Sequence, residues 1–143
     1  MDKYLIINAD DYGMCHSANM AVADLFQKGG ITSATIMTPC CWAKEAGKWA
    51  AAHPEYAVGV HLTFTSEWQN YRWSPLAQGE TGSLRDNEDF MYHESDEFEK
   101  NCDIDDVETE IRAQIERFKS FGVTPSHLDN HMGSLYGHYT SRL

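Results

Sequence analysis

Two adjacent carboxylates, Asp10 and Asp11, follow the short apolar run 4–7 and precede Gly13. The run predicts a strand that is buried on both faces, as in parallel sheets. Side chains alternate along a strand, so the two carboxylates would point in different directions and could serve different purposes. Neighbouring carboxylates also repel each other, which a bound cation or a raised pKa relieves. The alternative is a solvated turn in which an aspartate caps the next helix.

Three histidines lie where further strands are expected to end. His61 lies near the end of the apolar run 56–63, and His127 and His131 lie in the segment 126–133. One carboxylate with two imidazoles and open coordination positions is typical of a hydrolytic zinc site or a non-haem iron site. Such a cation activates bound water and polarises a carbonyl, and a carboxylate left unbound can accept the proton of the water.

The spacing of His127 and His131 leaves two alternatives. In an extended strand the two residues would be about 13 Å apart, which is too far to share an ion. In a helical turn they would be neighbours at about 5–6 Å. Either the chain turns after His127, or His127 alone binds the metal and His131 serves the substrate or supports another ligand. We favour His127 as the ligand.

Strands and helices must position these groups, and their order predicts the fold class. Further strands are expected at residues 31–37, 56–63 and 126–133, and helices at residues 15–30, 42–53 and 103–122. Alternation with short connections predicts an α/β fold with a parallel sheet and right-handed crossovers. Parallel strands end at the same edge, so Asp10, Asp11 and the three histidines should converge on one rim.

The segment 66–101 interrupts this rhythm and contains several aromatic residues, among them Trp68, Tyr71 and Trp73. A connection of this length is usually functional or disordered, and the aromatic content argues against disorder. The aromatic rings either pack within their own loop or stack on sugar rings of a substrate.

Composition narrows the class of partner. The 143 residues fit one domain, and the net charge of −11 argues against nucleic acid or an anionic membrane as a partner. No apolar run approaches the roughly 20 residues that span a bilayer, and the N-terminus does not resemble a signal peptide. The four cysteines form no CxxC pair. We therefore expect a cytoplasmic protein with reduced thiols and no zinc–thiolate site.

Three motifs resemble those of the YdjC-like carbohydrate deacetylases, which are similar to the wider polysaccharide deacetylase group. They are residues 8–13 (NADDYG), 59–63 (GVHLT) and 125–131 (PSHLDNH), in family order. The resemblance implies a deformed (β/α) barrel, a divalent metal ion (magnesium or zinc), and removal of N-acetyl groups from amino-sugar oligosaccharides, typically chitooligosaccharides.

The resemblance also implies a role for each matching residue. Asp11, His61 and His127 match the metal ligands, and Asp10 matches the base that activates water. His131 occupies the second histidine of an HxxxH-like motif and is assigned, with Asp10, to the catalytic residues.

The chain differs from the family pattern in its length, because the members of the family continue after the third motif. We expect a single domain, residues 1–143, that is truncated on its C-terminal side and forms an incomplete barrel. An incomplete sheet exposes an edge and an apolar face, which predicts a homo-oligomer.

The leading hypothesis is a metal-dependent deacetylase of amino-sugar oligosaccharides. One alternative is a catalytically silent fragment that binds metal or sugar. Another is a metal-dependent phosphoesterase, against which the scarcity of Lys and Arg near the motifs argues, since phosphate usually recruits cations.

Overall fold

The computed structural model describes residues 2–79 and 81–137 and contains a four-stranded parallel sheet. The strands lie in sequence order, as β1 (Asn8–Tyr12), β2 (Ser33–Ile36), β3 (Ala57–Leu62) and β4 (Leu128–Asn130). The α/β class with a parallel sheet is therefore confirmed.

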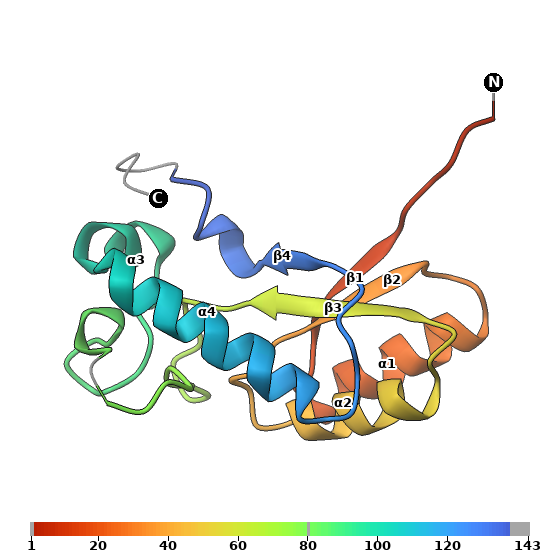
Figure 1. Ribbon diagram of the computed structural model, residues 1–143, viewed down its shortest axis with the longest axis horizontal. Coiled ribbons are helices and arrows are strands. Elements are labelled where there is room, and N and C mark those ends of the chain that lie inside the picture. Colours follow the sequence, from red (N-terminus) through yellow and green to blue (C-terminus); the bar gives the residue numbers. More distant parts are fainter. Residues whose placement is uncertain (1, 80, 138–143) are drawn as a thin grey trace.

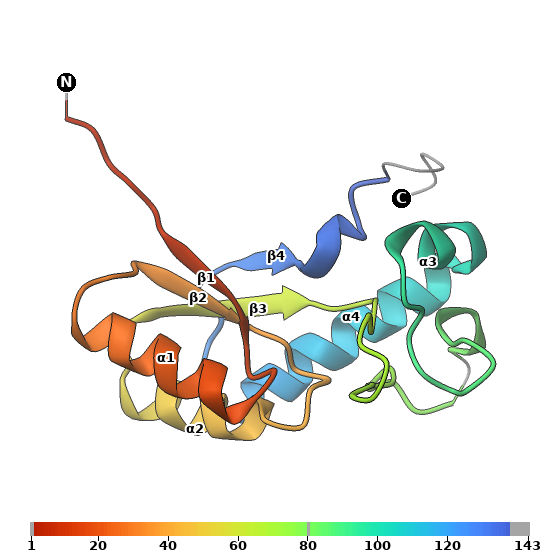
Figure 2. The same ribbon diagram turned by 180° about the vertical axis from the view of Figure 1, so that it is seen from behind.

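Three helices cover one side of this sheet. They are α1 (His16–Gln27), α2 (Ala43–Ala52) and α4 (Ile104–Lys119), and they contact β1, β2 and β3 respectively. Both ribbon views show all three on the same side of the strands (Figure 1 and Figure 2). The helices expected at residues 15–30, 42–53 and 103–122 are confirmed. Asp103 begins the last one, because its carboxylate accepts a hydrogen bond from the Asp105 amide at 2.9 Å.

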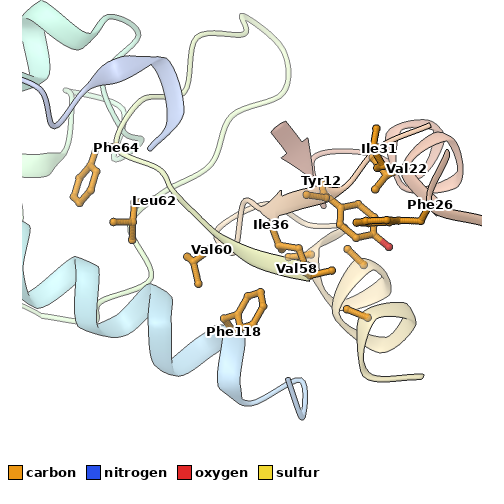
Figure 3. Packing of buried hydrophobic residues seen from close by; sticks show 14 of the residues in the cluster. Tyr12, Val22, Phe26, Ile31, Ile36, Val58, Val60, Leu62, Phe64 and Phe118 are labelled. Atoms are coloured by element: carbon orange, nitrogen blue, oxygen red, sulfur yellow. The ribbon is translucent and has the colours of Figure 1, made fainter. Parts of the chain in front are cut away.

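The strands divide their side chains between an apolar face and a polar face. Ile36, Val58, Val60 and Leu62 belong to the core, where Phe118 of α4 faces Val60 (Figure 3). Because side chains alternate along a strand, the intervening positions point to the other side. These positions carry Ser33, Thr35 and His61, and Asp129 of β4 joins them through contacts with Thr35 and His61. We call this side the polar face.

Close contact between β3 and β4 depends on Gly59. A Cβ at this position would lie 2.4 Å from the carbonyl oxygen of His127. The amide of Val60 donates to that same carbonyl at 3.1 Å. Glycine is therefore required where the chain entering β4 lies against β3.

The first strand does not lie where the apolar run predicts it. Tyr4, Leu5 and Ile6 are 91%, 75% and 78% exposed, and β1 begins only at Asn8. The prediction of a strand buried on both faces at residues 4–7 is wrong. The reason lies in the partner strand, since β2 begins at Ser33 opposite Asn8 and offers residues 4–6 nothing to pair with.

The segment 66–101 contains two short helices, η1 (Gly82–Leu84) and α3 (Ser95–Asn101), that its sequence does not predict. It is held in place by buried polar contacts. The Arg72 guanidinium donates to Asp86 at 2.7 Å and to the Met91 carbonyl at 2.6 Å, and the Trp73 indole donates to the Thr65 carbonyl at 2.8 Å. The Trp73 ring packs against Met91 of its own segment and against Met37 and Cys40 outside it.

None of the helices in residues 2–79 and 81–137 is long and apolar enough to cross a membrane.

Candidate metal centre

The C-terminal ends of β1, β3 and β4 bring Asp11, His61 and His131 together. One ligand atom from each residue lies within 4.8 Å of the other two. Asp11 Oδ1 is 3.4 Å from His61 Nε2 and 3.1 Å from His131 Nδ1. The two imidazole rings are 5.3 Å apart and nearly perpendicular, at 70°. The convergence expected for the rim is thus found for these three side chains.

A β-bulge directs Asp11 toward the rim. The pairing of β1 with β2 shifts register between Ala9 and Tyr12, and Asp11 adopts a φ of 60°. Regular alternation from Ala9, which packs against the core, would point Asp11 toward the helices as well. The bulge instead gives that position to Tyr12, which is fully buried in the core. Bulges commonly re-aim a side chain at a functional site.

His61 is oriented by Asp129, its partner across the β3–β4 pair. His61 Nδ1 lies 2.6 Å from Asp129 Oδ1, and Thr35 Oγ1 and Asn8 Nδ2 hold the other carboxylate oxygen at 2.9 and 3.2 Å. With the proton on Nδ1, which donates to Asp129, the lone pair of Nε2 faces Asp11. A carboxylate behind an imidazole is the usual support of a metal-binding histidine.

The pKa values around His61 follow from these contacts. Burial would lower the pKa of His61, but the nearby Asp11 carboxylate and the hydrogen bond with Asp129 outweigh it and raise the pKa to about 9. Burial would raise the pKa of Asp129, but its hydrogen bond with His61 keeps the pKa of that carboxyl below its ordinary value.

His131 is oriented by Glu67, which comes from the segment 66–101. The imidazole is 4% exposed and begins the 3₁₀ turn η2 (His131–Gly133) that follows β4. Its Nε2 lies 3.1 Å from both carboxylate oxygens of Glu67, and its Nδ1 faces Asp11. Burial would lower the pKa of His131, but the nearby Asp11 carboxylate and the contact with Glu67 raise it overall.

The donor set at Asp11 fits a cation. The close approach of the His131 and His61 imidazoles holds the pKa of Asp11 well below its ordinary value, so the carboxylate is ionised. Its Oδ1 is buried and lies within ion-pair distance of both imidazoles, but in hydrogen-bonding geometry with neither. A buried carboxylate oxygen and two oriented imidazole nitrogens are ligands that zinc and other divalent cations accept.

Asp10 lies beside this group rather than apart from it. It has a carboxylate oxygen within 4.8 Å of ligand atoms of both His61 and Asp129. Asn8 Nδ2 donates to Asp10 Oδ1 at 2.7 Å, and the side chain is exposed. Because of the bulge, both aspartates lie near His61, whereas the sequence suggests that they point in different directions.

His127 lies at the opposite end of β4 from His131. Its Nδ1 is 2.8 Å from Ser126 Oγ, and its ring lines a cavity of about 610 Å³ near the first residues of the strands. It is not part of the group that Asp11 and His61 form with His131. The extended backbone between the two histidines accounts for this separation, and the turn that the sequence allowed after His127 begins only at His131.

Two supporting carboxylates were not singled out from the sequence. Asp129 lies inside the third motif, but only the β3–β4 register places it opposite His61. Glu67 is 64 positions from His131 in the chain, and no spacing rule connects the two.

Comparison with known proteins identifies the family of this chain. The family model of YdjC-like proteins matches residues 4–140. The chain belongs to the YdjC-like family. The resemblance found from the three motifs is therefore confirmed.

Relatives of this YdjC-like chain are named deacetylases. It is 39% identical over 131 residues to a carbohydrate deacetylase of Geobacillus stearothermophilus, covering 92% of this chain and 50% of the relative. It is 31% identical over 134 residues to a chitooligosaccharide deacetylase of Yersinia pestis, again covering 92% and 50%. The YdjC-like chain thus spans about half the length of the curated relatives that it matches.

A solved structure shares the fold. A crystal structure from Enterococcus faecalis V583, described as a cellobiose-phosphate cleavage protein, matches with a TM-score of 0.81 and 32% identity. The match covers 93% of this YdjC-like chain and 49% of that chain. The four parallel strands therefore correspond to about half of a larger α/β structure.

Proposed function

We propose that this chain is the metal-binding part of a carbohydrate deacetylase that removes N-acetyl groups from amino-sugar oligosaccharides of the chitooligosaccharide type. The observation that supports this most strongly is the convergence of Asp11, His61 and His131, with a carboxylate behind each imidazole. The names of the Geobacillus and Yersinia relatives point to the same substrate class.

Asp11, His61 and His131 would hold the divalent ion, and His131 takes the place that the sequence suggested for His127. Two imidazoles and one carboxylate are a donor set typical of zinc, whereas magnesium prefers oxygen ligands. When bound, the ion would activate water and polarise the acetamide carbonyl.

Asp10 is the base in this proposal. Its carboxylate is exposed, lies beside His61, and is oriented by the Asn8 amide at 2.7 Å. It is not needed for the set of three ligands, so it remains available to accept a proton from the attacking water.

An Asp10→Asn variant tests this role. We expect acetate release from chitobiose to fall by about 10²- to 10⁴-fold. Zinc affinity, measured by calorimetry, should stay the same. Asp24→Asn on the exposed surface of α1 is the matched control and should release acetate like the unmodified chain. Unchanged turnover in Asp10→Asn would refute Asp10 as the base.

A catalytically silent metal- or sugar-binding fragment is a second candidate, because the chain covers only about half of its relatives. Calorimetric zinc binding without acetate release from chitobiose would favour this candidate. Release of phosphate from a panel of sugar phosphates, in place of acetate, would instead favour the phosphoesterase.

Self-association is part of the proposal. Tyr4, Leu5 and Ile6 are exposed beside one edge strand of the sheet, and Leu128 on the other edge strand is 51% exposed. Exposed apolar residues at sheet edges favour pairing with another chain. Sedimentation of the purified protein should therefore show a homo-oligomer, and a monomer at all concentrations would contradict it.

A further inference from the structure

The geometry points to Glu67 as a positioning residue that selects which nitrogen of His131 faces the metal, an inference that rests on the proposed metal centre. Glu67 has no role in the three motifs. Its two carboxylate oxygens both lie 3.1 Å from His131 Nε2, while Nδ1 of the same ring lies 3.1 Å from Asp11 Oδ1.

The two imidazoles are held with opposite nitrogens toward the centre. His61 gives Nδ1 to Asp129 and turns Nε2 toward Asp11, whereas His131 gives Nε2 to Glu67 and turns Nδ1 toward Asp11. An imidazole that donates one N–H to a carboxylate keeps the lone pair on its other nitrogen. Glu67 therefore keeps the proton on Nε2 and leaves Nδ1 free as a ligand.

Glu67 can do this because the chain beside it is fixed. The neighbouring Ser66 is fully buried, and its amide donates to the Tyr92 carbonyl at 2.8 Å. The Ser66 hydroxyl oxygen accepts hydrogen bonds from the Trp73 amide at 3.0 Å and from Arg72 at 3.2 Å. A carboxylate on a fixed backbone loses little freedom when it binds His131, which is the condition for an effective support.

Glu67 connects the segment 66–101 to the candidate metal centre. The Glu67 carboxylate lies at His131 Nε2, on the side of the ring away from Asp11. No residue of strands β1 to β4 makes this contact. The segment thus takes part in the metal centre through a carboxylate, independently of any contact between its aromatic residues and sugars.

Metal affinity and tautomer state test the inference together. We expect Glu67→Ala to weaken zinc binding, measured by calorimetry, by about 10- to 100-fold. Glu67→Gln, which keeps an acceptor of similar length, should recover part of that loss. Glu94→Ala removes the same charge from an exposed position in the same segment and should bind zinc as the unmodified chain does.

Nitrogen NMR of the metal-free imidazoles gives a second readout that a loss of folding would not mimic. In alkaline buffer, where the rings are neutral, His131 should carry its proton on Nε2 and His61 on Nδ1. Glu67→Ala should make His131 a mixture of tautomers and leave His61 unchanged. Equal zinc affinity and an unchanged His131 tautomer in Glu67→Ala would overturn the inference.

The two proposals fail in different ways. If the unmodified chain binds no divalent ion, the proposed function fails, but the tautomer of His131 in the Glu67→Ala variant still decides the role of Glu67. If the unmodified chain binds zinc and Glu67→Ala binds it equally well with the same tautomer, only the role of Glu67 is lost.

Discussion

The two imidazoles of the candidate centre have the same chemical support, but different parts of the fold supply it. His61 and its partner Asp129 lie on neighbouring strands, opposite each other in the sheet register. His131 lies in a 3₁₀ turn, and its partner Glu67 comes from the long connection after β3. In the first half of the site, backbone pairing sets the distance between the two residues. In the second half, buried side-chain contacts of the connection set it.

Hydrogen-bonded strands bring His61 and Asp129 opposite each other through the register of the sheet. A loop must first be fixed by contacts of its own, here those of Ser66, Arg72 and Trp73. We call His61 with Asp129 the strand half of the site, and His131 with Glu67 the loop half. We therefore expect changes in the strand half to affect both metal binding and folding, and changes in the loop half to affect mainly metal binding.

The largest expected effect on zinc affinity distinguishes His131 from His127, which lie at opposite ends of β4. His131→Ala removes a proposed ligand and should weaken zinc binding by at least about 100-fold, beyond the loss expected for a supporting carboxylate. His127→Ala, at the other end of the strand, should leave the calorimetric affinity unchanged. The reverse order of the two variants would restore His127 as the ligand that the sequence suggested.

Asp129→Asn tests the strand half. The change weakens the support of His61 and disturbs the contacts with Thr35 and Asn8, so zinc affinity should fall by about 10- to 100-fold. The metal-free protein should also lose about 1–3 kcal/mol in urea unfolding, because one of the two acceptor oxygens is replaced by an NH2 group and a part-buried donor loses its acceptor. Glu67→Gln should show no comparable loss of stability. An equal loss in both variants would remove the distinction between the two halves.

Arg72→Met tests whether the loop half depends on its own internal contacts. Asp86 loses one of its donors and the Met91 carbonyl loses the Arg72 donor, so the segment should loosen around Glu67. We expect zinc affinity to fall by only a few-fold, less than in Glu67→Ala, since the carboxylate itself remains. Hydrogen exchange of the amides in residues 66–93 should speed up while that of β3 stays slow. Wild-type exchange in this segment would contradict the prediction.

The smallest effect is in the pH dependence of stability without metal. Because the folded pKa of His61 is raised from the ordinary value of 6.5 to about 9, its protonation stabilises the folded chain fully below 6.5. This contribution is lost as the pH rises through about 9, so the melting temperature should fall across that range.

Bound zinc should reverse this trend, because it requires neutral imidazoles and competes with protons. The melting temperature of the zinc-loaded protein should therefore rise with pH over the same interval. His61→Gln should flatten the metal-free profile, and a profile with the unmodified slope would assign the effect to another group.

The same contrast separates what could be predicted from the sequence from what could not. Asp11 and His61 lie at the ends of apolar runs, and the rule that parallel strands end at one edge brings their backbones together. The bulge that turns the Asp11 side chain toward the centre has no such signal in the sequence. The choice between His127 and His131 depends on the residue at which β4 ends, which no local pattern reveals. Glu67 depends on the path of a long connection, and that path is set by contacts such as Arg72 with Asp86.

The start of β1 likewise could not be predicted from the local sequence. Residues 4–7 have the composition of a buried strand, but their exposure is decided by where the neighbouring β2 begins. Helix positions were easier to predict, because the periodicity of each helix is contained in its own segment.

The bulge at Asp11 restricts which residues the centre can tolerate. A left-handed backbone is accessible to aspartate and asparagine but is unfavourable for longer or branched side chains. Replacement by glutamate would keep the charge and the chemical class, yet it would work against the local main chain before any metal is added. Anyone who redesigns this centre for another ion therefore has more freedom at the two histidines than at the aspartate between them.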